Sequence, residues 1–371
     1  MFRIDLLPAE FGDALWIEYG SAGKVHRILV DCGTSAVYPV VRQRLQALPT
    51  KERHIELLVI SHIDIDHIGG ALDLLNDCKA LGVSFGEIWF NGYIHLTPGG
   101  TVEHDDTLGA LQGEALTELI VAQGAGNWNK AVKGGALVVP DSGPLLAFPE
   151  LPGGMRLTLL SPTQVQLDRL KPTWEAACRK AGLVPGKATL ADEKRLEEDE
   201  APGEEDDILG DPDVAQLAAK PFRPDRSRPN GSSIALLAEY DGRRVVLAAD
   251  AFAPVLIDSL SRLPGSGRGK LKIDAFKMSH HASRGNISPE LIAAIDCKNW
   301  LISTNGKVFR HPDLEAIARI IKGSGPGTVL HFNYRTEFNE MWAASGLQRK
   351  HAFKTRYPAG PNAGIGIEFE A

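Results

Sequence analysis

The segment from Ser61 to Gly70, which reads SHIDIDHIGG, constrains the fold of this chain more than any other. It follows Ile55 to Ile60, whose last four residues form the continuous apolar run expected of a strand buried on both faces. The next segment, Ala71 to Ala80, has helical periodicity. We interpret the intervening cluster as a tight loop in which Gly69 and Gly70 let the chain turn closely into the helix.

The polar residues of this segment are His62, Asp64, Asp66 and His67. Imidazole and carboxylate are the two ligand types that hold divalent transition metals without sulfur. At this spacing in a loop, the side chains can face two adjacent metal positions. An ordinary polar surface loop is the alternative, and it fits poorly because the residues lie between a buried strand and an apolar helix.

Further predicted strands end in the same kinds of residue. They run into Asp31, Asp250 and the pair His280-His281. Strand ends are where α/β proteins gather catalytic groups, because strands fix positions and loops expose side chains. The repetition of this pattern within one chain predicts that these residues meet in a single site.

Short strands and helices alternate along the chain in two β-rich parts. The predicted strands are Arg3 to Leu7, Ala14 to Tyr19, His26 to Val30, Ile55 to Ile60, Met155 to Leu160, Ile234 to Tyr240, Arg244 to Ala249, Leu271 to Met278, Trp300 to Ser303, Thr328 to Phe332 and Gly364 to Phe369. The predicted helices are Ala71 to Ala80, Thr107 to Gln123, Pro289 to Ile295 and Leu314 to Ile321. This order predicts an α/β fold with two sheets packed face to face and helices outside.

The character of the chain changes between about residues 163 and 229. Glu197 to Glu200 and Glu204 to Asp207 are acidic runs punctuated by proline and glycine. We interpret 163–229 as a flexible acidic insertion, most mobile over 187–212, because such dense charge is hard to bury. The rest of 1–371 is expected to form one domain.

Composition limits the function classes. The 371 residues include 40 Lys and Arg against 47 Asp and Glu, so no strongly basic balance indicates nucleic acid, although an acidic nuclease can carry a local basic patch. The sequence shows neither a signal peptide nor a long apolar span, and we expect a cytoplasmic protein with no membrane partner. The four cysteines form no CxxC pair and are expected to be reduced.

The segment from Ser61 to Gly70 resembles the HxHxDH signature of metallo-β-lactamase-fold hydrolases, with Asp64 where the common pattern has histidine. This variant looks like the hydrolase domain of ComEC-type DNA-uptake proteins and their soluble relatives. Ala249 and Ala282 stand where these proteins usually have glycine. Other matching pieces occur in order, namely Gly12-Asp13, Ile28 to Gly33, Asn230-x-Ser232-Ser233, Leu247 to Asp250, Ser279 to Ser283, Ser303-x-Asn305-Gly306 and His311-Pro312. The resemblance implies the αββα sandwich of the metallo-β-lactamase fold.

The resemblance also implies a site for two divalent metal ions, manganese or zinc. His62 and Asp64 would bind one metal, and Asp66 and His67 would bind the other.

The remaining ligands come from later segments of the chain. By the same resemblance, Asp250 would bridge the two metals, and His281 or His280 would complete the second site. Asp31 would orient a ligand from behind, as carboxylates do for metal-bound histidines.

The histidine that usually stands in the middle of the family's ligand set has no clear match here. His95 and His104 are candidates, although each also fits an ordinary loop histidine, and His331 is expected to be packed or on the surface. We expect weaker contributions to substrate binding from Ser283, Arg284, Asn305 and His311.

Three functions remain open from the sequence. The first, which we expect, is a metal-dependent phosphodiesterase or nuclease that acts on a phosphodiester or nucleic acid, with Asp66 and Asp250 as catalytic carboxylates. The second is a hydrolase of a lactone, ester or amide, and the third is a non-catalytic binding module with a decayed site. Basic residues that flank the site segments can receive phosphate or be ordinary surface charge, and they are Lys277, Arg284, Arg223, Arg226 and Arg228.

Overall fold

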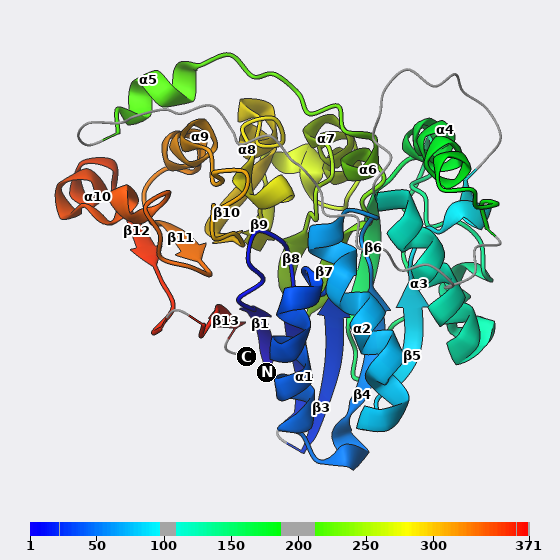
Figure 1. The fold of residues 1–371 in the computed structure, drawn as a ribbon. Coiled ribbons are helices and arrows are strands. Elements are labelled where there is room, and N and C mark those ends of the chain that lie inside the picture. Colours follow the sequence, from blue (N-terminus) through cyan, green and yellow to red (C-terminus); the bar gives the residue numbers. More distant parts are fainter. Residues whose placement is uncertain (22, 97–108, 187–211, 361, 370–371) are drawn as a thin grey trace.

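The computed structural model describes residues 1–21, 23–96, 109–186, 212–360 and 362–369. Its strands form two mixed sheets (Figure 1). The first has the order β13-β1-β2-β3-β4-β5 and contains β1 Phe2–Leu6, β2 Leu15–Ser21, β3 Lys24–Val30, β4 His54–Val59, β5 Ser84–Trp89 and β13 Ile365–Phe369. The second has the order β12-β11-β10-β9-β8-β7-β6 and contains β6 Arg156–Ser161, β7 Ala235–Tyr240, β8 Arg243–Leu247, β9 Leu271–Lys277, β10 Ile295–Ile302, β11 Thr328–Phe332 and β12 Phe353–Arg356.

Helices cover the outer faces of both sheets (Figure 1). Those over the first sheet are α1 Tyr38–Gln46, α2 Ile65–Leu81, α3 Gly109–Gly124 and α4 Gln164–Lys180. Those over the second are α7 Ala253–Ser261, α8 Pro289–Ala294 and α9 Leu314–Ser324, with α5 Val214–Ala219 packed on α9. The remaining α-helices among the described residues are α6 Arg228–Gly231 and α10 Ser345–His351.

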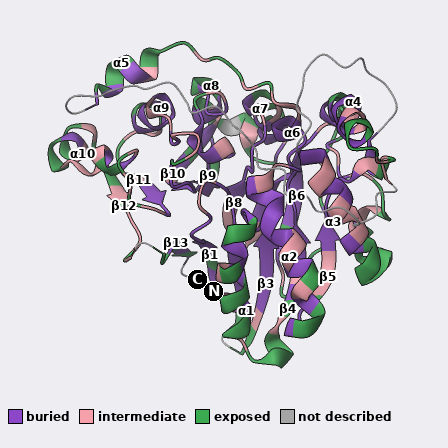
Figure 2. Cartoon of the chain, viewed as in Figure 1, coloured by how far each residue is buried: buried purple, intermediate pink, exposed green. Residues whose placement is uncertain are grey.

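The buried apolar residues fall into three clusters, as four layers require. One cluster lies between α1–α4 and the first sheet, one between the two sheets, and one between the second sheet and α7–α9. In β4 and just after it, Leu57 and Val59 face the opposite sheet, whereas Leu58 and Ile60 face the helices. All four are fully buried, which confirms a strand buried on both faces (Figure 2).

The predicted αββα sandwich is confirmed, but the prediction of flexibility over 163–229 is wrong for the part that forms α4. This helix buries Leu167, Leu170 and Trp174 in the core beside the first sheet. The acidic runs that suggested flexibility lie within 187–211, outside the described residues. The amphipathic pattern of α4 therefore outweighs the charge of the segment that follows it in the sequence.

Helix α2 begins at Ile65, inside the segment that the sequence analysis interpreted as a loop. Gly69 and Gly70 are therefore helical, and neither makes a turn. A Cβ atom on Gly69 would lie 2.9 Å from the backbone nitrogen of Ser35, and one on Gly70 would overlap the carbonyl oxygen of Cys32. The glycines are required because α2 packs directly on the backbone that follows β3.

Strand direction places the ends of several strands at one edge of the sandwich. In the first sheet β3 and β4 are parallel, and in the second β8, β9 and β10 are parallel. Their carboxyl ends are therefore followed by the segments that carry the predicted site residues. Among the described residues, no helix is long and apolar enough to cross a membrane.

Candidate metal centre

Asp31, directly after β3, fixes the orientation of His67. Its Oδ1 accepts a hydrogen bond from the Ser61 backbone nitrogen at 2.7 Å, and its Oδ2 accepts one from the Ser61 hydroxyl at 2.7 Å. His67 Nδ1 lies 2.8 Å from the same Oδ2, and all three residues are buried. Because His67 donates its Nδ1 proton to this carboxylate, its Nε2 carries a lone pair that points away from Asp31.

His62 is oriented through the same network. The Ser61 hydroxyl donates its proton to Asp31, so its oxygen accepts from His62 Nδ1 at 2.9 Å. The His62 Nε2 atom, which carries the lone pair, then lies 3.3 Å from Asp64 Oδ2 and 4.0 Å from Asp250 Oδ2. Two neighbouring histidines are thus held in the tautomer that binds metal through Nε2.

His281 reaches the cluster from the second sheet. Its Nδ1 donates to the Ser303 carbonyl at 2.8 Å, and its Nε2 lies 3.2 Å from Asp66 Oδ2 and 3.8 Å from Asp250 Oδ2. The backbone from His280 through His281 to Ala282 is left-handed, with φ of 49°, 51° and 71°. Strained turns of this kind cluster at functional sites, and this one directs the imidazole of His281 inward.

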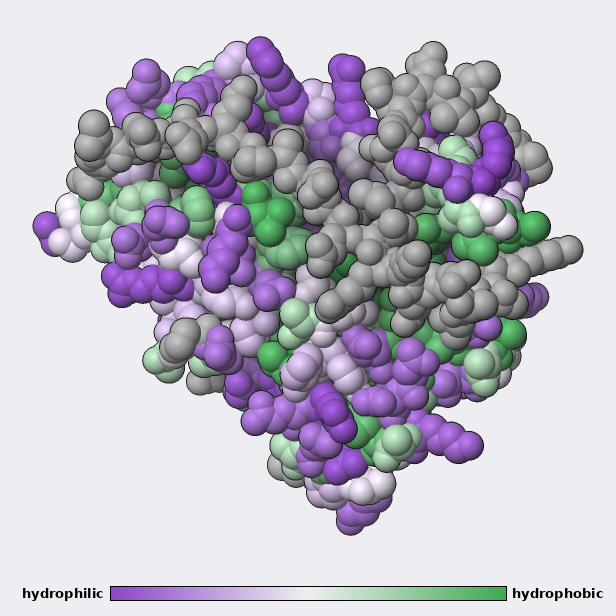
Figure 3. All heavy atoms as spheres, in the orientation of Figure 1, coloured by the Kyte–Doolittle hydropathy of each residue, from purple (hydrophilic) through white to green (hydrophobic). Residues whose placement is uncertain are grey.

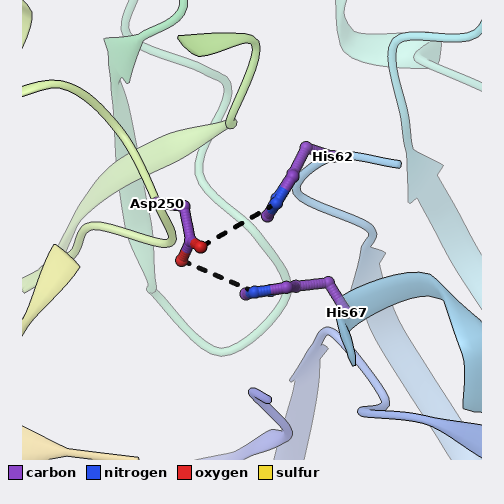
Figure 4. A group of neighbouring side chains, drawn as sticks. All are labelled: His62, His67 and Asp250. Carbon is purple, nitrogen blue, oxygen red and sulfur yellow. Dashed lines mark ion pairs between the residues drawn. The ribbon is translucent and has the colours of Figure 1, made fainter. Parts of the chain in front are cut away.

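Asp250 lies between the histidines. Figure 4 shows its carboxylate facing the rings of His62 and His67, and its Oδ1 is 3.5 Å from His67 Nε2. The Asp250 backbone nitrogen donates to Ser233 Oγ at 3.3 Å, so the motif around Ser233 supports the strand end that carries Asp250. Ala249 before it has φ of 45°, which explains why glycine is usual at this position in the resembling proteins.

His280 and His281 have different surroundings. His280 Nε2 lies 3.9 Å from Asp250 Oδ2, but its Nδ1 faces Asp225 at 3.3 Å and Asn286 Oδ1 at 3.1 Å. The Nε2 atom of His281 belongs to a compact group with Asp66 and His67. The structure therefore favours His281 as the ligand and places His280 between Asp250 and Asp225.

Four buried atoms of this cluster have no hydrogen-bond partner among the described residues. They are the Nε2 atoms of His62, His67 and His281 and the Oδ1 atom of Asp250. Buried polar atoms are almost always satisfied, and these four face a common space. The ligating atoms of His62, His67 and Asp250 lie within 4.8 Å of one another, as do those of Asp66, His67 and His281. The residues fit a divalent cation held by nitrogen and carboxylate ligands.

The charges of the metal-free cluster follow from this packing. Burial alone disfavours a charged imidazole, but Asp250 and its neighbours more than offset this effect. They raise the pKa of His281 to about 9 and that of His280 to about 10. Burial would raise the pKa of Asp250, yet the facing histidines, His67 first, hold it well below its ordinary value. In the metal-free protein, protons on these imidazoles therefore supply the positive charge that a bound cation would otherwise provide.

A buried ion pair joins the two sheets behind His281. Lys277 of β9 donates to Asp13 Oδ2 and to the Met278 carbonyl, and the side chains of Lys277 and Asp13 are almost completely buried. Asp13 Oδ1 also lies 3.5 Å from His281 Nδ1. Burial would raise the pKa of Asp13, but Lys277 and His281 hold it well below its ordinary value. Neither alternative left open for Lys277, contact with a substrate phosphate or ordinary surface charge, holds, because its ammonium group is enclosed.

Of the residues predicted to bind substrate, His311 lies beside the cluster. Its ring centroid is 5.3 Å from that of His280, and its Nδ1 is 3.2 Å from Asp313 Oδ1. Burial lowers the pKa of His311 despite the nearby Asp313, so the ring is neutral at pH 7. The Ser283 backbone N–H donates a hydrogen bond to the His280 carbonyl at 2.7 Å, which helps to shape the turn.

The two other predicted substrate-binding residues are engaged elsewhere. Arg284 is half-exposed and pairs with Glu315, with 3.7 Å between Nη1 and Oε1. Asn305 Oδ1 accepts a hydrogen bond from the Lys307 backbone nitrogen at 3.0 Å. The structure does not bring either side chain into the cluster.

The missing middle histidine is not supplied by His95. Its Nδ1 accepts from the Gly92 backbone nitrogen at 3.0 Å, and its Nε2 lies 3.2 Å from the Gly134 carbonyl, so both ring nitrogens are used. The other candidate, His104, lies outside the described residues. His331 is packed in β11 with its Nε2 3.1 Å from Asn299 Oδ1, which confirms the expectation for this residue.

Sequence reasoning missed several residues that support the cluster. Ser61 sets the tautomer of His62, while Asp225 and Asn286 contact His280. The position of Ser61 directly before His62 was an available signal. Asp225 lies in an irregular segment whose sequence gives no sign of where it packs.

One comparison with known protein families agrees with this fold. Residues 8–104 match the family model described as the metallo-beta-lactamase superfamily. No curated protein matches the sequence. One solved structure, described as "CmlA beta-hydroxylase E377D mutant", is 10% identical, with a TM-score of 0.39. That match covers 98% of this chain, and the chain spans 54% of the length of that protein. Residues 8–104 are therefore similar to the metallo-beta-lactamase superfamily, and the two packed sheets with outer helices have the architecture of the metallo-β-lactamase fold.

Proposed function

We propose that this protein is a metal-dependent hydrolase that cleaves phosphodiesters, as a phosphodiesterase or nuclease does. One observation carries the proposal: three unpartnered histidine Nε2 atoms and the carboxylates of Asp66 and Asp250 converge in a buried cluster. Two divalent ions bound there would lower the pKa of a water molecule and stabilise negative charge on phosphoryl oxygens.

The carboxylates of the cluster support phosphodiester chemistry over ester chemistry. Asp64, Asp66 and Asp250 give the cluster as many carboxylates as it has inward-facing histidines. An oxygen-rich ligand set is harder and suits manganese better than an all-histidine set. Phosphoryl oxygens are in turn good ligands for hard divalent ions.

The chain's own groups have distinct tasks in this proposal. Burial would raise the pKa of Asp66, but His67 and His281 lower it, so Asp66 is ionised at neutral pH and its Oδ2 can accept a proton. Asp64, whose side chain is 28% exposed, is the cluster residue that lies nearest to solvent. Asp31 and Ser303 hold His67 and His281 in place and do not contact the reacting atoms.

The proposal is tested by assaying the purified protein after reconstitution with manganese or zinc. The substrates are a generic phosphodiester, single- and double-stranded DNA, RNA, a lactone and a carboxylic ester, with Asp250→Ala as the matched inactive control. We expect hydrolysis of phosphodiesters, with manganese at least as effective as zinc. Hydrolysis of the lactone or ester alone would identify a carbon-ester hydrolase. A protein that binds no metal and cleaves nothing would be a binding module.

A further inference from the structure

A second polar feature lies beside the candidate metal centre, between α4 and α6. The two helices contact each other (Figure 1). Between them and the strand end that follows β8 is a half-open cavity of about 260 Å³. Its lining residues are Gln166, Arg169, Asp225, Arg226, Ser227, Arg228, Gly231 and Phe252.

The cavity has an excess of positive charge. Arg169, Arg226 and Arg228 line it together with a single carboxylate. Arg228 is held in place because its Nη1 donates to Thr173 Oγ1 at 2.7 Å. Within the part of the chain that the structure describes, no carboxylate pairs with Arg169 or Arg226.

The carboxylate that lines the cavity, Asp225, already accepts hydrogen bonds from residues outside the cavity lining. Its Oδ2 accepts from Asn230 Nδ2 at 2.8 Å and from Asn286 Nδ2 at 3.1 Å, and it lies 3.3 Å from His280 Nδ1. Its charge is therefore directed toward His280, and among the described residues that line the cavity no second carboxylate compensates the arginines. Guanidinium groups in this state favour phosphate, which they bind through charge-assisted hydrogen bonds.

The cavity and the metal cluster share their walls. His280 lies between Asp225 of the cavity and Asp250, with its Nδ1 3.3 Å from Asp225 Oδ2 and its Nε2 3.9 Å from Asp250 Oδ2. Asn286 Nδ2 also joins the two, because it donates to Asp225 Oδ2 and to the Asp250 carbonyl at 3.1 Å each. Phe252 follows Asp250 by two residues, and a Cβ on Gly231 would lie 2.8 Å from the Phe252 ring. Phe252 thus provides an apolar surface between the arginines and the cluster.

We infer that this cavity binds a phosphate group of the substrate other than the one that is cleaved. The inference rests on the proposed phosphodiesterase function and names its substrate class: an oligonucleotide, in which a neighbouring internal or terminal phosphate occupies the arginine cavity. Phe252 then faces the sugar or base between the two phosphates. The cluster cleaves one phosphodiester, and the cavity selects substrates that carry a second phosphate.

The test compares substrates with and without that second phosphate. The set is a dinucleotide with one phosphodiester, the same dinucleotide with a 5′- or 3′-terminal phosphate, and a trinucleotide with a second internal phosphate. The variants are Arg169→Ala and Arg226→Ala, and Arg349→Ala on α10 is the control because it removes the same charge from an exposed position away from the cavity.

In the wild type, kcat/KM should rise when the second phosphate is present. In each cavity variant it should fall by about tenfold for those substrates, as expected for one lost charge-assisted hydrogen bond, and should stay unchanged for the plain dinucleotide. The substrate for which kcat/KM falls in the variants, with either the terminal or the internal second phosphate, shows which phosphate enters the cavity. Equal losses on all substrates, or no loss on any, would overturn the inference.

A binding measurement separates this inference from the proposed function. The affinity of metal-free protein for a fluorescent 5′-phosphorylated oligonucleotide should fall about tenfold in Arg226→Ala and remain unchanged in Arg349→Ala. If the wild type cleaves no phosphodiester but this difference is found, the proposed activity fails and the phosphate site stands. If cleavage is found but binding is the same in both variants, the activity stands and the phosphate site fails.

Discussion

Strand β4 has histidines near both of its ends, and the two groups differ in how their polar atoms are satisfied. At the amino end, His26 Nδ1 lies 2.6 Å from Glu56 Oε1, and His54 Nε2 lies 3.3 Å from Glu56 Oε2. At the carboxyl end, His62 and His67 use Nδ1 in hydrogen bonds and leave Nε2 buried and unpartnered.

This difference distinguishes a cluster that satisfies its own polar atoms from one that leaves them open to a ligand. None of the three residues at the amino end of β4 has a buried nitrogen or oxygen without a partner in the described structure. Histidine beside a carboxylate is therefore not sufficient evidence of a metal site. The decisive feature is a set of lone pairs that the protein orients toward one another and does not satisfy itself.

The largest effect is expected at Asp250, which faces both histidines at the carboxyl end of β4. Asp250→Ala should abolish metal binding and hydrolysis while leaving the fold intact, because the carboxylate faces His62 and His67 from the first sheet and His281 from the second. Metal content, turnover and circular dichroism measure the three effects. Full turnover in a folded Asp250→Ala protein would move the active site elsewhere.

The ion pair behind His281 should dominate the stability of the same region. Lys277→Met leaves the Asp13 carboxylate buried without its partner and should cost about 3–5 kcal/mol of unfolding free energy. The double variant Asp13→Leu, Lys277→Met should recover most of this loss, because an apolar pair needs no compensation. Urea unfolding of the two variants checks both values, and equal stability of the single and double variants would contradict the prediction.

A substitution at Asp31 tests whether the orientation of the histidine lone pairs matters for metal affinity. Asp31→Asn retains the shape of the side chain but places an amide where His67 Nδ1 needs an acceptor, and metal affinity should fall by about 10–100-fold. The matched change at the other end of β4 is Glu56→Gln, which should cost about 1–3 kcal/mol of stability and leave metal affinity unchanged. A loss of metal affinity in Glu56→Gln would mean that the two ends are not distinct.

Two buried histidines, His281 in the cluster and His331 in β11, should respond to pH in opposite directions. In metal-free protein, His281 has a pKa of about 9, so its contribution to stability is complete below its unfolded value of about 6.5 and is lost as pH rises toward 9. Burial lowers the pKa of His331 to about 4, so its contribution is lost as pH falls from about 6.5 to 4.

Chelated protein should therefore be most stable near pH 6.5, and added metal should move this optimum upward because the ligands bind as neutral imidazoles. Unfolding curves from pH 4.5 to 9.5, with and without manganese, measure this shift. An optimum that metal does not move would argue against ligation by His281.

The sequence predicts most of the fold and of the cluster for identifiable reasons. Local hydrophobic patterns predict the strand at Ile55 to Ile60 and the strands that run into Asp31, Asp250 and His280, and the structure contains each of them. Their convergence follows from parallel strand direction. Ala249 and Ala282 depart from glycine at positions where the chain is left-handed, with φ of 45° and 71°.

Other features depend on packing that local patterns do not encode. The early start of α2 at Ile65 reflects contact with the backbone after β3. The enclosure of Lys277 requires Asp13 from the other sheet, 264 residues away in the chain. The arginine cavity exists because α4 packs on α6, so Arg169 had no sequence signal connecting it to Arg226.

The most direct test of the central claim is a crystal structure of protein grown with manganese, with anomalous differences recorded near the manganese edge. The account predicts anomalous peaks within bonding distance of His62 Nε2, His67 Nε2 and His281 Nε2, beside Asp66 and Asp250, and no peak at His26, His54 and Glu56. A peak at the amino end of β4, or none at the carboxyl end in protein that is saturated with manganese, would contradict it.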